Sequence, residues 1–503
     1  MTSIIKTNSF IRFLVVLISV LIFTASCVYF SSAAVTDNTT ITDVTLNPNY
    51  NNLKDNKPSS YSSLNKFSIT SKEIIDSIYI VFWDSTPNFT LTCGDKSYEI
   101  ENSFLHAFVK IPQEVANCKE VTVTFKEKAN VSDISSFKKG DLPDWVQVWN
   151  QPHEKADLLL NVTHYSNEHT FFAGILPYHI ANKYRTQVVF FTESTSSANK
   201  HEMLDGLWAV GMKNYPVLSS FSESNTKTSA EALKALEKNK VTEDMIISFQ
   251  TEVLRRFKPQ VVVSHDLKGE NGNGQYILNA ETLVKAVELA NDSSKYPDSA
   301  QKYGVWNTPK LYLHLYKDNQ IKLNWDESLD FFDGKTAFQV SQEGYKENTS
   351  QQKSWFTKWL NGNDNKNTSA AKIETYSPCL FGLYRTTVGQ DTQKNSFFEN
   401  IISYDEQIRL EQERLEQEKL EQERLEQEEK KKQEEESKRL ESLRVESIEE
   451  ESRAAASEQK ELEEQKYQAW QNAKSDKNKG IVAIIVLICS VAILSVIIIK
   501  KHR

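Results

Sequence analysis

The stretch ADLLLNVTHYSNEH, residues 156–169, opens the part of the chain whose pattern decides the fold. Its apolar run, 157–162, is followed by similar runs at 187–192, 260–264 and 310–316. Helical stretches lie between these runs; they are 203–210, 243–257 and 280–290. Strands that alternate with helices are typical of a parallel sheet covered by helices on both faces. The sequence therefore predicts a Rossmann-like α/β domain over residues 142–400.

A different pattern lies upstream of this region. Short apolar runs such as 78–82 and 121–125 alternate with turn residues, which predicts a small β-sandwich domain over residues 64–141. Cys93 and Cys118 flank part of this segment and are predicted to form a disulfide, which leaves Cys379 over. The preceding residues, 35–63, are rich in Asn, Thr and Ser without apolar periodicity, so we expect a flexible leader there.

Both ends of the chain are apolar. Residues 13–30 follow basic residues and precede small ones, which is typical of a cleaved signal peptide at 1–34; an uncleaved anchor is the alternative. Residues 480–499 carry no charge and are long enough for a transmembrane helix. The basic tail, 500–503, predicts a cytoplasmic C-terminus. We therefore expect a single-pass type I membrane protein whose main part is lumenal or extracellular, in the endoplasmic reticulum or at the cell surface.

Sequons for N-glycosylation agree with this secretory route. The predicted glycosylation sites are Asn38, Asn88, Asn130, Asn291, Asn348 and Asn367. The sequon at Asn161 is expected to stay unmodified, because it lies in a predicted strand of the α/β core.

Residues 404–474 contain neither Gly nor Pro, and from Arg409 they repeat Arg/Lys-Leu-Glu-Gln-Glu four times. A leucine every five residues advances by about 140° around a helix, so the leucines form no coiled-coil seam. The basic residues have Glu three or four positions away, which stabilises a solitary helix. We expect a monomeric helical stalk that acts as a spacer; a partner-binding helix is the alternative.

The stalk also carries the charge imbalance of the chain. It holds 23 Asp and Glu against 14 Lys and Arg, which accounts for the net charge of -9 of all 503 residues. The remainder is balanced and has no basic stripe, which argues against nucleic acid as a partner. An aromatic content of 11% argues against a wholly disordered chain.

Several blocks of the α/β region occur in a fixed order. After the stretch quoted above come FFAGILPY (171–178), HEMLDGLW (201–208), SHDLKGENGNGQY (264–276), PKLY (309–312) and SPCLFGLY (377–384). Together they resemble the LmbE/PIG-L family of N-acetylglucosaminyl deacetylases over residues 142–398. The resemblance implies a Rossmann-like fold and zinc-dependent removal of an acetyl group from a sugar such as N-acetylglucosaminyl-phosphatidylinositol.

In that family the motif His-Pro/Ala-Asp-Asp-Glu supplies two zinc ligands and a general base, and a second motif supplies the third ligand and an oxyanion histidine. Carried over to this chain, the first ligand position is kept as His164. Ser166 stands at the base position and Asn167 at the second ligand position. Asn273 stands at the oxyanion position and Tyr276 at the third ligand position. The Glu that closes the first motif is kept as Glu168.

These departures predict weak or absent zinc binding. An amide oxygen and a protonated phenol are poor replacements for a carboxylate and an imidazole, and a Ser hydroxyl is no general base near neutral pH. The sequence therefore predicts a catalytically inactive deacetylase homologue that keeps a cleft for a sugar or glycolipid. Two alternatives stay open: an active hydrolase with ligands displaced to His169, His201 or His265, and an adhesion or scaffold protein.

Overall fold

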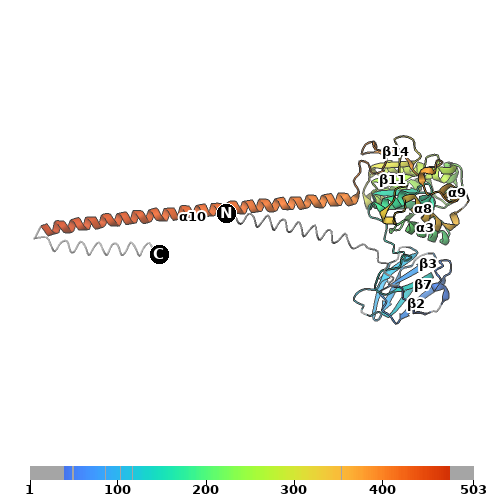
Figure 1. Ribbon diagram of the computed structural model, residues 1–503, viewed down its shortest axis with the longest axis horizontal. Helices are drawn as coiled ribbons and strands as arrows, with labels where there is room; N and C mark the ends of the chain where they lie inside the picture. The colour runs from blue at the N-terminus through green and yellow to red at the C-terminus, as the bar shows by residue number, and fades with distance from the viewer. Residues whose placement is uncertain are drawn as a thin grey trace. The chain divides into compact units, whose positions relative to one another are not determined.

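The computed structural model describes residues 39–475 except 48–49, 85–86, 102–103, 116 and 353 (Figure 1). The predicted signal peptide at 1–34, the sequon at Asn38, the membrane span at 480–499 and the tail at 500–503 lie outside the described residues. Among the helices within them, none combines the length and apolar character that crossing a bilayer requires. The chain divides into two compact units, Met1–Gln407 and Ile408–Arg503, and each is described by itself.

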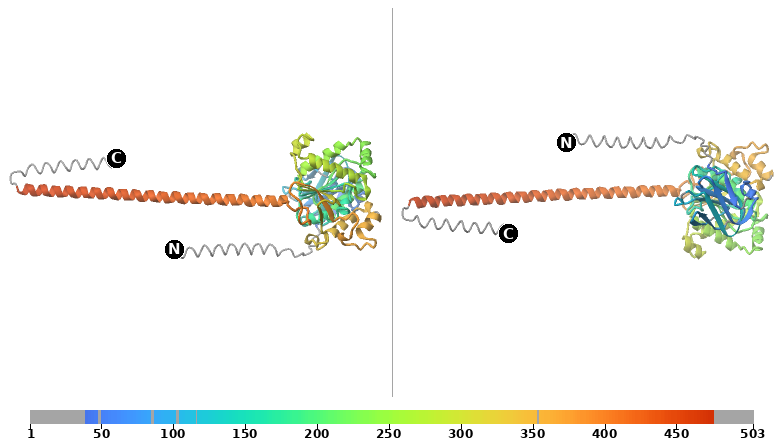
Figure 2. Two further views of the ribbon diagram at one scale, coloured as in Figure 1. Left: turned by 90° about the horizontal axis from the view of Figure 1, so that it is seen from above. Right: turned by 90° about the horizontal axis from the view of Figure 1, so that it is seen from below.

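Seven antiparallel strands form the β-domain at the start of the first unit (Figure 2, right, blue and cyan). They are β1 (Val44–Asn47), β2 (Ser62–Ser71), β3 (Ser77–Phe82), β4 (Phe89–Cys93), β5 (Lys96–Ile100), β6 (His106–Lys110) and β7 (Glu120–Phe137). The long strand β7 pairs with β2 and β4 over its first part and with β3 over its second part. Side chains from both halves, such as Phe67 and Leu91 on one and Ile78 and Ala107 on the other, share one core. The halves therefore face each other, as in the predicted sandwich, but they are joined through β7 into one hydrogen-bonded sheet.

Two details of the β-domain concern sequence predictions. Cys93 and Cys118, the predicted pair, are joined by a disulfide, and Cys379 is free and buried. The expectation of a flexible leader over 35–63 is wrong for its described part, because β1 pairs with β2. Leu46 and Leu53 supply the apolar side chains that hold this segment in the core.

A second sheet of seven strands forms the α/β domain. The strands are β8 (Leu158–Val162), β9 (Thr186–Phe190), β10 (Val217–Leu218), β11 (Val261–Ser264), β12 (Lys310–His314), β13 (Gln320–Lys322) and β14 (Leu380–Thr386). Their order is β10-β9-β8-β11-β12-β14-β13, and the first five are parallel. This order places β8 and β11 side by side in the middle of the sheet. From β8 the chain continues to β9 on one side, and from β11 it continues to β12 on the other side. The Rossmann-like α/β prediction is confirmed, and β13 and β14 add an antiparallel edge.

Helices cover both faces of this sheet, as Figure 2 shows. The α-helices are α2 (Ile175–Ala181), α3 (Ser197–Ala209), α4 (Ser229–Glu237), α5 (Glu243–Phe257), α6 (Gly274–Leu289), α7 (Pro297–Tyr303), α8 (Ala337–Glu347) and α9 (Ser354–Asn361). The short 3-10 helices of this domain are η2 (Asn167–His169), η3 (Glu270–Gly272), η4 (Asp330–Phe332), η5 (Thr349–Gln351) and η6 (Ala370–Lys372), whereas η1 (Asn51–Lys54) belongs to the β-domain. Side chains of β8 alternate between the faces: Leu158 and Leu160 pack with α2, α3 and α8, and Leu159 packs with α5 and α6.

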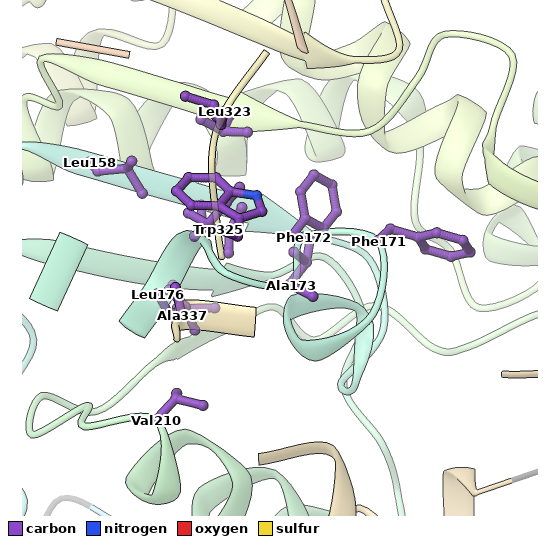
Figure 3. Close-up of a cluster of buried hydrophobic side chains, with 14 of the residues drawn as sticks. Leu158, Phe171, Phe172, Ala173, Leu176, Val210, Leu323, Trp325 and Ala337 are labelled. Atoms are coloured by element: carbon purple, nitrogen blue, oxygen red, sulfur yellow. The ribbon is translucent and has the colours of Figure 1, made fainter. Parts of the chain in front are cut away.

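One glycine fixes the packing near the end of β8. Figure 3 shows Trp325 beside Leu158, Phe172 and Leu323 in the core. Gly174 has a φ of 95°, and a Cβ on it would lie 2.4 Å from the Trp325 ring. Only a glycine meets both demands without strain, so Gly174 allows the turn after η2 to press against this indole.

The helix α10 (Tyr404–Ser475) confirms that the segment predicted as a stalk is helical, and its role as a spacer stays a prediction. Ion pairs such as Arg409–Glu413, Arg414–Glu411 and Arg424–Glu421 join residues three or four positions apart. Its first residue belongs to the globular unit, where the Tyr404 backbone N donates to Asp157 Oδ1 over 2.6 Å. The oligomeric state of the stalk stays a prediction.

Candidate functional site

The candidate site is a pocket at the carboxyl ends of β8 and β11. Ligands of open α/β sheets bind where neighbouring strands send their connections in opposite directions, and β8 and β11 are such a pair. The pocket has a volume of about 260 Å³. Its lining residues are His164, Tyr165, Ser166, Asn167, Glu223, Ser224, Asn225, Asn273, Tyr276, Gln351 and Phe356. Five of the six positions that the resemblance marked, all but Glu168, are therefore brought together here.

Asn167 organises the floor of this pocket. Its Oδ1 accepts a hydrogen bond from the His164 backbone N over 2.9 Å, and its Nδ2 donates to the Tyr276 hydroxyl over 3.1 Å. The amide is 2% exposed, so both of its ends are held by the protein. An amide fixed in this way closes the turn after β8 and orients the phenol.

Tyr276 lies in the first turn of α6 and stands at the position of the third family ligand. Its ring stacks on His265, with centroids 4.5 Å apart and planes inclined by 7°. Burial raises the pKa of the Tyr276 hydroxyl above its usual range, so the phenol stays protonated near neutral pH. A neutral phenol that already accepts from Asn167 is not a zinc ligand.

His164 has one ring nitrogen fixed by its neighbours. Its Nδ1 lies 3.0 Å from Thr192 Oγ1, and that hydroxyl donates to Thr163 O over 2.8 Å. The hydroxyl proton is thus used, so Nδ1 is the donor to Thr192. Glu223 Oε1 lies 3.7 Å from the same Nδ1.

Glu223 is a lining residue that sequence reasoning missed. It lies in the connection between β10 and α4, and its side chain is 40% exposed. It belongs to none of the family blocks, and no spacing pattern relates it to His164. The loop reaches the pocket because β10 pairs in parallel with β9, and β9 pairs in parallel with β8. The segments that follow these strands therefore lie at the same edge of the sheet.

The donor set of the pocket does not fit a zinc ion. Open-site zinc needs three protein ligands of the carboxylate, imidazole or thiolate type. Here the imidazole of His164 and the carboxylate of Glu223 are present, which leaves one ligand missing. The Asn167 oxygen is engaged by the backbone and the Tyr276 phenol is protonated, so neither supplies that ligand. Across the part of the chain that the structure describes, no group of three His, Cys, Asp or Glu side chains is arranged to hold a metal.

The three histidines proposed as displaced ligands lie elsewhere. His169 is buried between α3 and α8, where it meets Gly206 and Gly344. His201 on α3 lies against the β-domain, with Nε2 at 3.3 Å from Trp83 O. His265 is held by Glu270, 2.7 Å from its Nδ1. None of the three lines the pocket with His164, so the hypothesis of displaced ligands finds no cluster among the described residues.

A buried polar network supports the floor of the pocket from behind. His265 Nε2 accepts from the Thr163 backbone N over 3.0 Å, and its Nδ1 donates to Glu270 Oε2. His314 Nε2 donates to Ser377 O over 2.9 Å, and its Nδ1 faces Glu270 Oε1 over 2.6 Å. Burial by itself would raise the pKa of Glu270, but its contacts with His265 and His314 hold it well below the usual range. Since both nitrogens of His314 face oxygen acceptors, this ring is an imidazolium paired with an ionised Glu270.

The retained Glu168 lies on η2, behind the pocket rather than in it. Its side chain is fully buried, and neither carboxylate oxygen makes a hydrogen bond of normal geometry. His169 Nε2 lies 3.3 Å from Glu168 Oε1. Burial raises the pKa of Glu168 to about 8 and lowers that of His169 to about 3, so both side chains are uncharged at neutral pH.

The structure also places the sequons. Asn88 and Asn291 are exposed, and Asn130 and Asn367 are half-buried. Asn348 is fully buried and its Nδ2 donates to Gly344 O over 3.2 Å, so the predicted glycan there disagrees with the folded chain. Asn161 is buried too, with its amide bonded to Ser264 and Asn279, which agrees with the expectation that it stays unmodified.

Comparison with known proteins gives low similarity. No protein family model matches the chain, and no curated protein does. Similar solved structures include N,N'-diacetylchitobiose deacetylase from Pyrococcus horikoshii, at 12% identity over 49% of this chain and 94% of that chain, with a TM-score of 0.32. A conserved protein from Thermus thermophilus has 14% identity over 46% of this chain and 97% of that chain, with a TM-score of 0.30. A deacetylase of the teicoplanin biosynthetic pathway has 11% identity over 45% and 96%, with a TM-score of 0.27. Deacetylases are thus among the structural neighbours, at low identity and over about half of this chain.

Proposed function

We propose that the α/β domain binds a neutral sugar in the pocket that His164 lines and does not hydrolyse it through zinc. The observation that carries this proposal is the bridge from the His164 backbone through the Asn167 amide to the Tyr276 hydroxyl. This bridge occupies two family ligand positions with neutral groups that are already hydrogen-bonded to each other. The position is built as a structural element of the pocket wall, not as a metal site.

The lining of the pocket suits a ligand rich in hydroxyl groups. Amides are supplied by Asn225, Asn273 and Gln351, and hydroxyls by Ser166 and Ser224. These groups both donate and accept, so they match sugar hydroxyls better than they match an anion or a cation. The rings of Tyr165, Tyr276 and Phe356 add apolar surface for the C–H faces of a sugar ring.

The cellular setting is part of the same proposal. We propose a chain held by a single C-terminal span, with the globular part lumenal or extracellular and the stalk as a spacer. The supporting evidence is the charge and hydropathy of the two ends together with the sequons.

Calorimetry on the full chain tests sugar binding. N-acetylglucosamine should bind, and Asn225→Ala should weaken binding by about tenfold, because one good hydrogen bond to a ligand accounts for about 1.4 kcal/mol. Asn225 is exposed, so this change leaves the core intact. Asn395→Ala, an exposed asparagine outside the pocket lining, is the matched control and should bind like the unmodified chain. Absence of sugar binding in the unmodified chain would refute the proposal.

Metal analysis after dialysis tests the second part of the proposal, that the pocket does not hydrolyse the sugar through zinc. The unmodified chain should hold no stoichiometric zinc. The combination Ser166→Asp, Asn167→Asp, Asn273→His and Tyr276→His should gain zinc binding, because an Asp keeps the acceptor of Asn167 and a His is smaller than the Tyr it replaces. One tightly held zinc in the unmodified chain, with chelator-sensitive release of acetate from N-acetylglucosamine, would show that the pocket is a zinc-dependent deacetylase site and would overturn this part of the proposal.

A further inference from the structure

An aromatic cluster lies beside the pocket on and around α9. Trp355 and Trp359 stack with centroids 6.1 Å apart and planes inclined by 9°, and Tyr376 lies 6.5 Å from Trp355. These three rings are called the aromatic platform below. Trp359 and Tyr376 are half-buried, whereas Trp355 is 42% exposed. The platform therefore presents one large indole to solvent and supports it from beneath.

The platform is continuous with the pocket. Phe356 lines the pocket and packs edge-on against Trp355 at 4.8 Å. Phe171 contacts Tyr276 in the pocket at 6.0 Å and Trp359 in the platform at 5.4 Å. Figure 3 shows that the side chain of Phe171 points away from the core indole of Trp325, unlike that of its neighbour Phe172. An unbroken series of rings thus leads from the pocket floor to the exposed Trp355.

Hydrogen bonds hold two residues that precede α9, Ser350 and Gln351, and one residue of the platform, Trp359. Glu202 on α3 accepts hydrogen bonds from the backbone N and the hydroxyl of Ser350. Gln351, which lines the pocket, donates to the Tyr165 hydroxyl over 2.7 Å. Trp359 Nε1 donates to Thr375 O over 2.8 Å. A rigid aromatic surface binds a ligand without the entropy cost of ordering it first.

We infer that Trp355 is a second sugar subsite, so that the pocket binds one ring of an oligosaccharide and the platform binds the next. This inference rests on the sugar binding proposed above. A pocket of about 260 Å³ lies below the range of about 300–1,000 Å³ typical for drug-sized ligands, so it has room for little more than one sugar ring. The next ring must leave the pocket, and the exposed indole is the apolar surface that continues from its rim.

Affinity as a function of sugar length tests this subsite. Calorimetry on the full chain should show that chitobiose, the β-linked disaccharide of N-acetylglucosamine, binds about tenfold more tightly than the monosaccharide, since an added aromatic contact of about 1.4 kcal/mol changes Kd tenfold. Trp355→Ala should remove this gain and leave the affinity for the monosaccharide within about twofold of the unmodified chain. Trp355→Tyr should restore part of the gain. Trp470→Ala, an exposed tryptophan on α10, is the matched control and should change neither affinity.

The possible outcomes separate the two proposals. If the monosaccharide binds but the disaccharide gains nothing, or the gain survives Trp355→Ala, the subsite is refuted and the sugar pocket stands. If octyl N-acetylglucosaminide binds more tightly than the disaccharide and loses this advantage in Trp355→Ala, the platform holds an alkyl chain and the sugar subsite is refuted. If neither saccharide binds the unmodified chain, the proposed function fails, and the subsite fails with it.

Discussion

Glu168 and Glu270 are both fully buried near the carboxyl ends of adjacent strands, yet their surroundings differ. Glu270 faces the ring nitrogens of His265 and His314 and accepts from the Asp266 backbone N over 3.2 Å. Glu168 has no hydrogen bond of normal geometry to either oxygen. As a result, the pKa of Glu270 is held well below its usual range, whereas that of Glu168 is raised to about 8.

The difference shows that partners, not burial, decide the charge of an interior carboxyl. Removing a carboxylate from water costs several kcal/mol, and close cations and donors offset this cost only when their geometry is good. Glu270 has such partners on both oxygens, so it is ionised and holds the loop after β11 to the end of β12. Glu168 lacks them, so it is protonated and acts as a neutral packing group behind the pocket.

Removing the charge of Glu270 should have the largest effect. Glu270→Gln leaves the buried imidazolium of His314 without its counter-ion, and breaking one side of a buried pair costs about 3–5 kcal/mol. Urea unfolding at neutral pH, followed by tryptophan fluorescence, should show this loss in the free energy of unfolding. Glu374→Gln, at an exposed glutamate, should unfold like the unmodified chain. A loss no larger than that of this control would mean that Glu270 carries no charge in the folded chain.

Filling the space beside His169 should have an intermediate effect. A Cβ on Gly344 would lie 2.6 Å from His169 Cε1 and 2.8 Å from Val210 Cγ1. Overpacking of a closed core costs about 1–3 kcal/mol, and the same unfolding assay should detect this loss in Gly344→Ala. Adding His169→Ala should recover part of the loss, because it removes one of the two clashing groups. If the two changes are strictly additive, His169 does not occupy the space that Gly344 leaves.

Much of the fold could be predicted from local patterns, whereas the environment of individual residues could not. The apolar runs after residue 157 predict the parallel strands because each is buried on both faces. The two-residue strand β10 gives no such signal, yet it leads into the loop that brings Glu223 to the pocket. Likewise, β1 has only Leu46 buried, so its apolar pattern is too short to distinguish a strand from a leader.

The candidate site was predictable as a set of positions but not as a set of contacts. The motif order places His164, Asn167 and Tyr276 in one pocket, and the structure agrees. Nothing in the motif says that the Asn167 amide bridges the other two, because that bridge depends on how the turn after β8 meets α6. The sequon at Asn348 fails for a similar reason: its burial comes from α3 and α8 packing together, which no three-residue pattern encodes.

The smallest expected effect is on the pH dependence of stability, and it isolates Glu168. The folded pKa of Glu168 is about 8, against an ordinary value of 4.5, so between these values the folded chain holds a proton that the unfolded chain has released. Stability must then fall as pH rises through this window, by up to about 1.4 kcal/mol per pH unit. Glu168→Gln cannot ionise and lacks this loss, so its stability relative to the unmodified chain should rise by about that amount from pH 6.5 to 7.5.

The neighbouring His169 has a folded pKa of about 3 against an ordinary 6.5, so it lowers the stability of the protein on acidification. This effect falls mainly below the interval from pH 6.5 to 7.5 and is the same in both proteins. Urea unfolding of the two proteins at both pH values measures the difference, with Glu374→Gln as the control that should follow the unmodified chain. Parallel pH profiles for Glu168→Gln and the unmodified chain would mean that Glu168 is already ionised when folded, and the contrast with Glu270 would then disappear.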